Sequence, residues 1–317
     1  MDVSGVEANI KFHRFDKDMM EMDTNNVREA FYSLQKKYPE FLPKYYSLIV
    51  GLGDYQDSSA PELFKQFITF QPTRELYKKV QDKFPSTEKY NEEITEVFRH
   101  YKYYFSEDTL PEIVYFMGIL KYGAGYDDNQ VALGLDMYLD EPEFYGRMAN
   151  LTNYLIEKMK PEYITRNVAH NFGYYKFAKY MKGNRFIDRM IYEGKIAYFI
   201  KAMMPKSHDS LILALNGQNL KWCEDNEWQI WKHYVDPEYK VLYTTNPDIT
   251  ERYFEEAPFT NAPGVPNHEE RSSPRFAVWT GFKIIQKYMD KNPNVTLAQL
   301  MEETDSDKIL KESKYKP

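Results

Sequence analysis

The stretch Glu112–Leu139, EIVYFMGILKYGAGYDDNQVALGLDMYL, decides which class of fold the chain can adopt. Its two ends, residues 112–118 and 130–139, are short and rich in Val, Ile, Leu and Tyr, which is typical of β-strands. Between them, residues 121–129 gather Gly, Asp and Asn, the residues that form turns. The stretch therefore predicts two strands joined by a loop.

A third strand is expected near the start of the chain. Val6, Ala8, Ile10 and Phe12 alternate with polar residues, which is the period of a half-buried strand. We expect this strand to share one small sheet with the other two.

Most of the remaining sequence has helical periodicity. Thr24 is a suitable N-cap residue for a first helix, with Val27 and Phe31 at helical spacing behind it. Ser273 and Pro274 suit the N-cap and first position of another helix. The segment 255–273, with three prolines and a glycine, is expected to be irregular. Helices are expected from Thr24 onward and over about 39–51, 60–70, 73–83, 86–104, 146–159, 161–181, 184–204, 218–235, 248–254, 274–290, 296–302 and 305–313.

Strands interrupted by long helical blocks predict an α+β fold that is mostly α-helical, with one small β-sheet packed against many helices. No stretch resembles an interdomain linker, so we expect a single domain over residues 1–317. Within it, a helical part would cover about 1–108, and the sheet and a cleft core about 109–317. A sheet followed by paired helices is also where zinc peptidases of the gluzincin type hold their metal.

Composition narrows the classes of function. The net charge is −7 and basic residues are interspersed with acidic ones, so nucleic acid is not expected as a main partner. A single cysteine excludes an intrachain disulfide and any multi-cysteine metal site. No run of 18 apolar residues occurs, and the first residues do not read as a signal peptide. Glycine-rich phosphate loops, serine elbows and Cys/His nucleophile pairs are missing from the sequence as well.

The segment VAHNFGYYKF (168–177) holds the first candidate site. A His-Glu-x-x-His helix places two imidazoles on one face with a glutamate as base. Here His170 has Asn171 where the glutamate would be and Tyr174 where the second histidine would be. An amide cannot act as a general base, and a phenol with a pKa near 10 is a poor zinc ligand. The helix is either a zinc site without its chemistry or an ordinary helix with one histidine.

Glu193 is the second candidate. It lies in the segment MIYEGKIAYF, roughly 20 residues after His170. The apolar neighbours Ile191, Ile196 and Phe199 indicate a largely buried helix, and a buried carboxylate needs a partner. The alternatives are a structural salt bridge or part of a polar cleft.

The remaining candidates are four separate residues. Asp136 ends the strand-like run LGLDMYLD, either as a turn residue or within a strand that binds a substrate backbone. Trp222 belongs to an aromatic helix, residues 221–234, that forms core packing or a platform for sugar or peptide. Arg275 and Trp279 lie one helical turn apart, and they line a cleft or close the core.

In addition, the chain resembles the gliding-motility lipoprotein B family, in order and over nearly its whole length. The segments that carry this resemblance are VSGVEANIKFHRFDKDM, LGLDMYLD, RMIYEGKIAYFIKAMMP, LKWCEDNEWQIWKHYV, EEAPFT, SPRFAVWTGFKIIQKYMDKNP and ILKESKYKP.

That family is similar to a larger group of predicted zinc-dependent peptidases, so the resemblance implies a zincin-like architecture. It places His170 and Tyr174 at the first and second ligand positions, Asn171 at the base and Glu193 at the third ligand position. This sequence departs from that pattern at two of the four. The resemblance also implies an N-terminal lipid anchor on the periplasmic face of a bacterial membrane. We expect the anchoring cysteine to precede the residues of this sequence.

The expected function is therefore that of a non-enzymatic, lipid-anchored periplasmic protein. Its degenerate cleft would bind an envelope protein, a peptide or a glycan, without a cofactor and with zinc disfavoured. One alternative is an active metallopeptidase that completes its site with Asp136 or His208. Another is an aromatic-lined glycan binder that uses Trp222 or Trp279.

Overall fold

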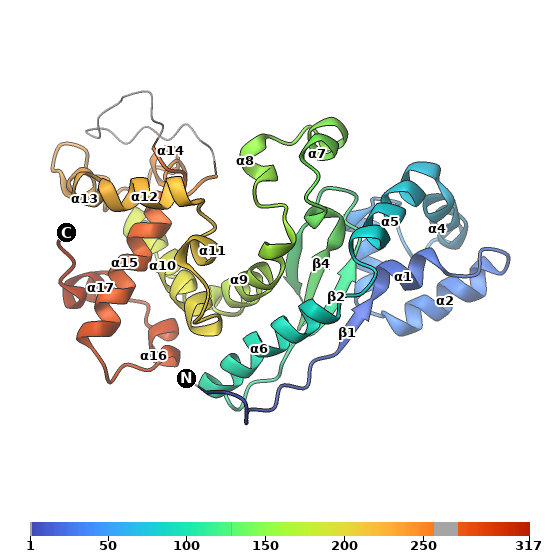
Figure 1. Cartoon of the computed structure of the whole chain (residues 1–317), viewed down its shortest axis with the longest axis horizontal. Coiled ribbons are helices and arrows are strands. Elements are labelled where there is room, and N and C mark those ends of the chain that lie inside the picture. Colours follow the sequence, from blue (N-terminus) through green and yellow to red (C-terminus); the bar gives the residue numbers. More distant parts are fainter. Residues whose placement is uncertain (1, 128, 257–271) are drawn as a thin grey trace. The chain divides into compact units, whose positions relative to one another are not determined.

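The computed structural model describes residues 2–127, 129–256 and 272–317 (Figure 1). Two compact units make up the chain. Unit 1 consists of Met1–Val6, Val97–Asp108 and Phe172–Pro317, and unit 2 of Glu7–Glu96 and Thr109–Asn171. That the whole chain forms a single domain stays a prediction.

Unit 2 contains a four-stranded sheet in the order β1-β2-β4-β3. Strands β1 (Phe12–Arg14), β2 (Glu112–Phe116) and β4 (Gln130–Gly134) are parallel, and β3 (Ala124–Asp127) is antiparallel to β4. The expected α+β class, mostly helical with one small sheet, is confirmed.

The strands begin and end at residues other than the expected ones, because hydrogen-bonded pairing with a neighbouring strand determines where each strand begins and ends. The N-terminal strand begins at Phe12, since only Phe12–Arg14 pair with β2, and residues 6–11 form no strand. The expected loop contains β3, which forms a hairpin with β4. Strand β4 ends at Gly134, where the 3₁₀ turn η2 (Leu135–Tyr138) begins.

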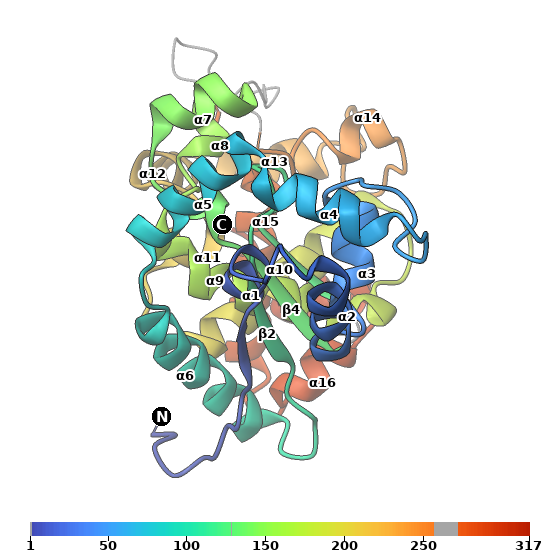
Figure 2. The same ribbon diagram turned by 90° about the vertical axis from the view of Figure 1, so that its right-hand side faces the viewer.

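Aromatic side chains fill the core of unit 2. Phe15, the first residue of α1 (Phe15–Met20), meets Tyr38, Phe41 and Tyr45 edge-on, with ring centroids 4.8–5.0 Å apart. Phe41 in turn meets Phe116 of β2, so this cluster joins helices to the sheet. Helix α1 packs on β2 (Figure 2). The helices and helical turns of unit 2 are α1 (Phe15–Met20), α2 (Val27–Lys37), α3 (Phe41–Lys44), the π-helical turn η1 (Tyr45–Ile49), α4 (Ala60–Thr69), α5 (Gln71–Lys83), η2, α7 (Pro142–Ala149), α8 (Asn153–Ile156) and η3 (Pro161–Tyr163).

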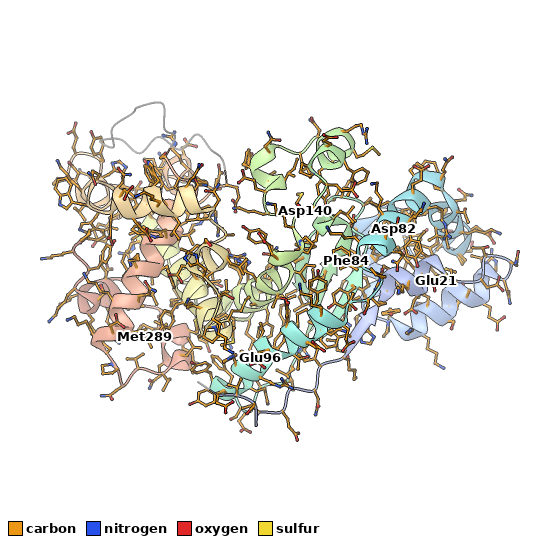
Figure 3. All side chains as sticks on the ribbon, viewed as in Figure 1. Glu21, Asp82, Phe84, Glu96, Asp140 and Met289 are labelled. Atoms are coloured by element: carbon orange, nitrogen blue, oxygen red, sulfur yellow. The ribbon has the colours of Figure 1, made fainter. Side chains whose placement is uncertain are left out.

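The described part of unit 1 is helical. Helix α10 (Phe186–Met203) is buried almost all round, which is typical of a helix surrounded by others. Side chains from each unit fill the space between that unit's own elements (Figure 3). Unit 1 contains η4 (Ala178–Tyr180), α10 (Phe186–Met203), α11 (Asp209–Leu213), α12 (Gly217–Asp225), α13 (Glu227–Val235), α14 (Pro247–Thr250), α15 (Phe276–Lys291), α16 (Leu297–Glu302) and α17 (Ser306–Ser313). Helices α6 (Glu88–Tyr104) and α9 (Ile164–Lys176) contribute residues to both units.

Helices α10 and α15 pack closely at two glycines. A Cβ atom at Gly281 would lie 2.1 Å from the carbonyl oxygen of Met190, and one at Gly194 would lie 2.3 Å from the backbone of Gly281. Glycine therefore allows a backbone approach that no larger residue permits.

Several expected helix ends are wrong. Helix α2 has Asn26 as its N-cap residue instead of Thr24. Helix α15 begins at Phe276 instead of Pro274, because Arg275 has a left-handed backbone with φ of 55°. The single helix expected over 218–235 is interrupted at Asn226.

Other expected helices are divided as well. The helix expected over 39–51 consists of α3 and the π-helical turn η1, and the one over 146–159 consists of α7 and α8. Most of the segment expected to be irregular, residues 257–271, lies outside the described residues. Among the described residues, no helix is both long and apolar enough to cross a membrane.

Candidate functional site

Helix α9 carries three of the four expected site residues: His170, Asn171 and Tyr174. Asn171 donates a hydrogen bond from Nδ2 to the carbonyl oxygen of Asn167, one turn earlier, at 2.9 Å. This hydrogen bond joins the side-chain amide to the backbone of the same helix. An amide in this state is neither a proton acceptor nor an activator of water.

Tyr174 is half-buried in unit 1. Burial raises the pKa of its phenol above the ordinary value, and the negative charge of Glu193 raises it further. The phenol therefore keeps its proton at neutral pH. In this form it can donate a hydrogen bond, but it is not a phenolate ligand for a divalent cation.

Glu193 lies on α10 and is only 9% exposed. Among the described residues, its carboxylate forms no hydrogen bond and no ion pair, although a structural salt bridge was one of the two expected roles. Its charge acts on Arg275 too: burial lowers the pKa of that guanidinium, and Glu193 opposes the effect. Glu193 is thus a largely buried carboxylate whose bonding capacity is open to a ligand.

These side chains do not fit a zinc ion. A zinc site needs three or four imidazole, thiolate or carboxylate ligands, whereas this set offers one imidazole, one carboxylate, an amide and a protonated phenol. Within the ranges that the structure describes, no group of three or more His, Cys, Asp and Glu side chains could hold a metal. No chemical step through a metal follows from this arrangement.

Asp136 is fully buried in η2 of unit 2 and already has partners. Its carboxylate accepts hydrogen bonds from the backbone N–H groups of Gly118 and Leu120, both at 2.7 Å. Burial raises its pKa to about 6. These bonds fasten the loop after β2, in which Ile119 and Leu120 both have positive φ.

His208, the other residue considered for completing a metal site, caps a helix. Its Nδ1 accepts a hydrogen bond from the backbone N–H of Ser210 at the start of α11, at 3.2 Å. It belongs to unit 1, whereas Asp136 belongs to unit 2.

Arg275 and Trp279 lie in the interior of unit 1. Trp279 is 2% exposed. The guanidinium of Arg275 donates to the carbonyl oxygen of Leu213 at 3.0 Å and lies 3.4 Å from the carboxylate of Glu256. Both side chains are therefore used in packing and in internal bonds.

The aromatic helix expected over 221–234 has two different faces. Trp222 packs on Phe276, with ring centroids 6.0 Å apart. Trp228 is 56% exposed, and the ammonium group of Lys232 lies 5.3 Å from its ring centroid. The tryptophan that unit 1 presents to solvent is thus Trp228, which the sequence did not single out.

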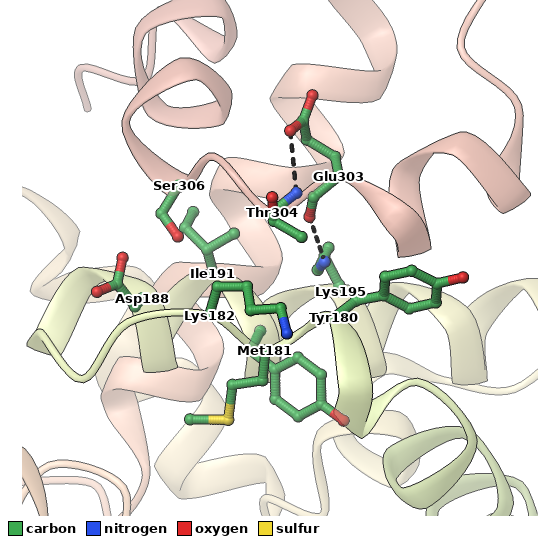
Figure 4. Close-up of a pocket in the computed structure, with 10 residues that line it drawn as sticks. Tyr180, Met181, Lys182, Asp188, Ile191, Lys195, Glu303, Thr304 and Ser306 are labelled. Atoms are coloured by element: carbon green, nitrogen blue, oxygen red, sulfur yellow. Dashed lines mark hydrogen bonds between the residues drawn. The ribbon is translucent and has the colours of Figure 1, made fainter.

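Unit 1 also has a small polar pocket that is open to solvent (Figure 4). Lys195 of α10 lines it and is only 2% exposed. Its Nζ donates to the carbonyl oxygens of Met301 and Glu303, at 3.1 and 2.8 Å, where α16 ends. Burial lowers the pKa of this amine to about 8, against a weaker opposing effect of Glu303. The pocket is lined by Tyr180, Met181, Lys182, Asp188, Ile191, Tyr192, Lys195, Glu303, Thr304 and Ser306.

The two carboxylates of the pocket are already paired. Burial alone would raise the pKa of Asp188, but the hydrogen bonds from Arg185, at 2.7 and 2.9 Å, outweigh it and lower the pKa. A hydrogen bond from Lys308, at 2.5 Å, is the main cause that lowers the pKa of Glu303. The exposed Lys182, in contrast, has no hydrogen bond or ion pair with a described residue.

Sequence reasoning missed this pocket, although one signal was present. Lys195 interrupts the apolar run around Ile191 and Ile196, so a charged side chain had to enter the helical core. Its acceptors could not be foreseen, because they follow more than 100 residues later.

The chain matches, over residues 1–317, the model of the family described as Gliding motility protein GldB. No curated protein and no protein of solved structure matches it.

Proposed function

Since the chain belongs to the gliding motility protein GldB family, we propose that it serves gliding motility as a non-enzymatic, lipid-anchored protein on the periplasmic face of a bacterial membrane. The family supports an association with gliding motility and a lipoprotein of the cell envelope. The periplasmic location, the binding role and a zincin-like architecture with a degenerate cleft are our proposals.

The observation that carries the non-enzymatic role is the state of Asn171 and Tyr174. Zinc-dependent hydrolysis requires a general base and a ligand set that activates water. The amide of Asn171 is bonded to the backbone of Asn167, and burial keeps the phenol of Tyr174 protonated. Neither side chain can replace the carboxylate and imidazole of an active site.

We place the binding role at Tyr174 and Glu193. The largely buried carboxylate of Glu193 offers acceptors that no described residue uses. A hydrogen-bond donor of an envelope protein, a peptide or a glycan would bind to this carboxylate, beside the phenol of Tyr174. Hydrogen bonds made in a partly dehydrated site are specific, because an unsuitable ligand leaves a polar group without a partner.

The test measures zinc content and peptide hydrolysis for the unchanged protein. We expect less than one equivalent of zinc after dialysis, and no hydrolysis of an unfolded peptide library with or without zinc. Tightly bound zinc together with hydrolysis that a chelator abolishes would refute the non-enzymatic role.

A double variant tests the architecture separately. Asn171→Glu with Tyr174→His restores the His-Glu-x-x-His pattern on α9. We expect this variant to bind zinc more tightly than the unchanged protein, and Asn171→Gln with Tyr174→Phe serves as the matched control. Equal zinc binding in both double variants would count against a zincin-like cleft, whatever the unchanged protein does.

A further inference from the structure

His233 of α13 is a buried imidazole that lacks a full set of hydrogen-bond partners. Only 4% of the residue is exposed. Its Nε2 lies 3.0 Å from the phenol oxygen of Tyr253, so these two groups share one hydrogen bond. Its Nδ1 is shielded from solvent and forms no hydrogen bond with a described residue. The ring therefore has a partner for one of its two nitrogen atoms.

Aromatic side chains surround this imidazole. The ring centroids of Tyr234, Tyr239 and Tyr253 lie 6.1, 5.2 and 5.7 Å from that of His233. Burial raises the pKa of Tyr234 and Tyr253 above the ordinary value. Neither of these phenols therefore supplies a negative charge beside the imidazole at neutral or acidic pH.

The charged groups near His233 do not favour a proton on its ring. Within the described ranges, no carboxylate forms an ion pair with the imidazole. Burial lowers the pKa of His233, and Asp236, in the loop after α13, opposes this with a smaller effect. On the facing segment, Arg252 carries a positive charge that acts on the phenol of Tyr253.

A protonated His233 does not fit this arrangement. An imidazolium ion has two N–H donors, and Nδ1 would place one of them where no described acceptor lies. The positive charge would also be withdrawn from water, and attraction to the aromatic rings returns only part of the lost hydration. Both costs disappear when the ring reaches solvent, so protonation favours a local opening that exposes it.

Tyr253 anchors a short segment, residues 247–254, to the interior of unit 1. Its ring packs on Phe276 and Phe186, with centroids 4.9 and 5.8 Å away. Its carbonyl oxygen accepts a hydrogen bond from the backbone N–H of Ala277 at 3.3 Å. The helix of this segment, α14, has only four residues. Few backbone hydrogen bonds therefore oppose the release of the segment once its contact with α13 is weakened.

We propose that His233 and Tyr253 form an acid-sensitive latch, in which a proton on His233 releases residues 247–254 from α13. The closed form binds this proton less tightly than the open form, in which the imidazole has its ordinary pKa of 6.5. The contact is therefore fully stable above about pH 6.5 and loses stability as the pH falls below that value. The latch goes beyond the proposed function and does not depend on it, because neither residue takes part in binding at Glu193.

Hydrogen–deuterium exchange of the unchanged protein between pH 5.5 and 7.5 measures the opening of residues 247–254, after correction for the intrinsic exchange rate. We expect the open fraction to rise by up to about tenfold from pH 7.5 to 5.5. The backbone amides of α10 are the internal reference and should show no such rise. A constant open fraction, or an equal rise in α10, would overturn the proposal.

Two variants test whether the imidazole is responsible. His233→Gln keeps a hydrogen-bonding group for Tyr253 but cannot take up a proton, so its segment should open equally at both pH values. His208→Asn is the matched control, because it removes an exposed imidazole of unit 1 and leaves a residue that caps helices well. This control should keep the pH dependence. An undiminished pH dependence in His233→Gln would overturn the latch.

A further measurement needs no variant. Exchange of the C2 hydrogen of each histidine, followed by mass spectrometry, gives the pKa of His233 in the unchanged protein. We expect a pKa below 6.5. A pKa at or above 6.5 would overturn the proposal, whether or not His233→Gln folds.

Discussion

At the scale of single residues, the buried charged side chains of this protein have different kinds of hydrogen-bond partner. Asp136 is bonded to two backbone N–H groups, Asp188 to an arginine and Lys195 to two carbonyl oxygens. Glu193 forms no hydrogen bond and no ion pair with a described residue, so its carboxylate oxygens can accept hydrogen bonds from a ligand.

Asp136 should make the stability of the protein depend on pH. Its carboxyl group has a pKa of about 6 in the folded protein and an ordinary value of 3.8, so the folded state binds the proton more tightly. This group therefore contributes stability that is fully present below about pH 4 and is lost as the pH rises through 6, by at most about 3 kcal/mol. Urea unfolding at several pH values between 4.5 and 7 measures this loss. In the unchanged protein the free energy of unfolding should include a component that falls as the pH rises, and Asp136→Asn should lack this component.

The exposed residue Asp57 provides the control for this measurement. Hydrogen bonds from Ser59 lower its pKa, so Asp57→Asn should leave the component between pH 4.5 and 7 in place. If Asp136→Asn and the unchanged protein have parallel stability curves over this range, the buried carboxyl group does not titrate as expected.

The two carboxylates bonded to Arg185 should differ in importance. Asp188 is buried, with 4% of its side chain exposed, and it also accepts the backbone N–H of Arg185, whereas 49% of Asp307 is exposed. Asp188→Asn should reduce the free energy of unfolding by about 1–3 kcal/mol, and Asp307→Asn by less than about 1 kcal/mol. Chemical denaturation of both variants checks this order, and equal effects would contradict it.

At the scale of elements, the contact between α10 and α15 limits which residues unit 1 accepts. Gly194→Ala or Gly281→Ala would place a methyl group against backbone atoms that cannot move aside. We expect each to lower the free energy of unfolding by about 1–3 kcal/mol or more. Thermal and urea unfolding would measure the loss.

Gly146 of α7 is the matched control for these two glycines. It is exposed, and an added Cβ would meet nothing within 4 Å. Since alanine is the better helix former, Gly146→Ala should be neutral or stabilise the protein by about 0.5–1 kcal/mol. A loss at Gly146 as large as at Gly194 would mean that the effect is not specific to the close contact between α10 and α15.

At the scale of the whole molecule, the family relates the chain to the cell envelope. Our proposal predicts that the lipid-bearing protein partitions into the detergent phase of a cell extract, since acyl chains confer membrane affinity. Loss of the acyl chains should move it to the aqueous phase. Protease added to cells with a permeabilised outer membrane should digest it, whereas resistance until lysis would refute the periplasmic location.

The elements that the sequence predicts best are those that local composition defines. The apolar runs of β2 and β4 and the helical stripes of α4, α5 and α6 need no distant partner to be recognised. Strand β3 was missed, because its Gly-rich sequence becomes a strand only by pairing with β4. The start of α15 was misplaced because the left-handed backbone of Arg275 is not encoded by its own side chain.

The sequence also predicts some features of the candidate site and leaves others to the tertiary structure. The sequence alone shows that α9 carries an amide at Asn171 and a phenol at Tyr174, where a His-Glu-x-x-His helix has a carboxylate and an imidazole. That Lys195 meets the carbonyl groups of Met301 and Glu303 depends on contacts between distant segments. Composition and periodicity thus determine the classes of element and the functional groups that each helix carries. Only tertiary packing decides which buried charges are satisfied, because each partner is supplied by a remote part of the chain.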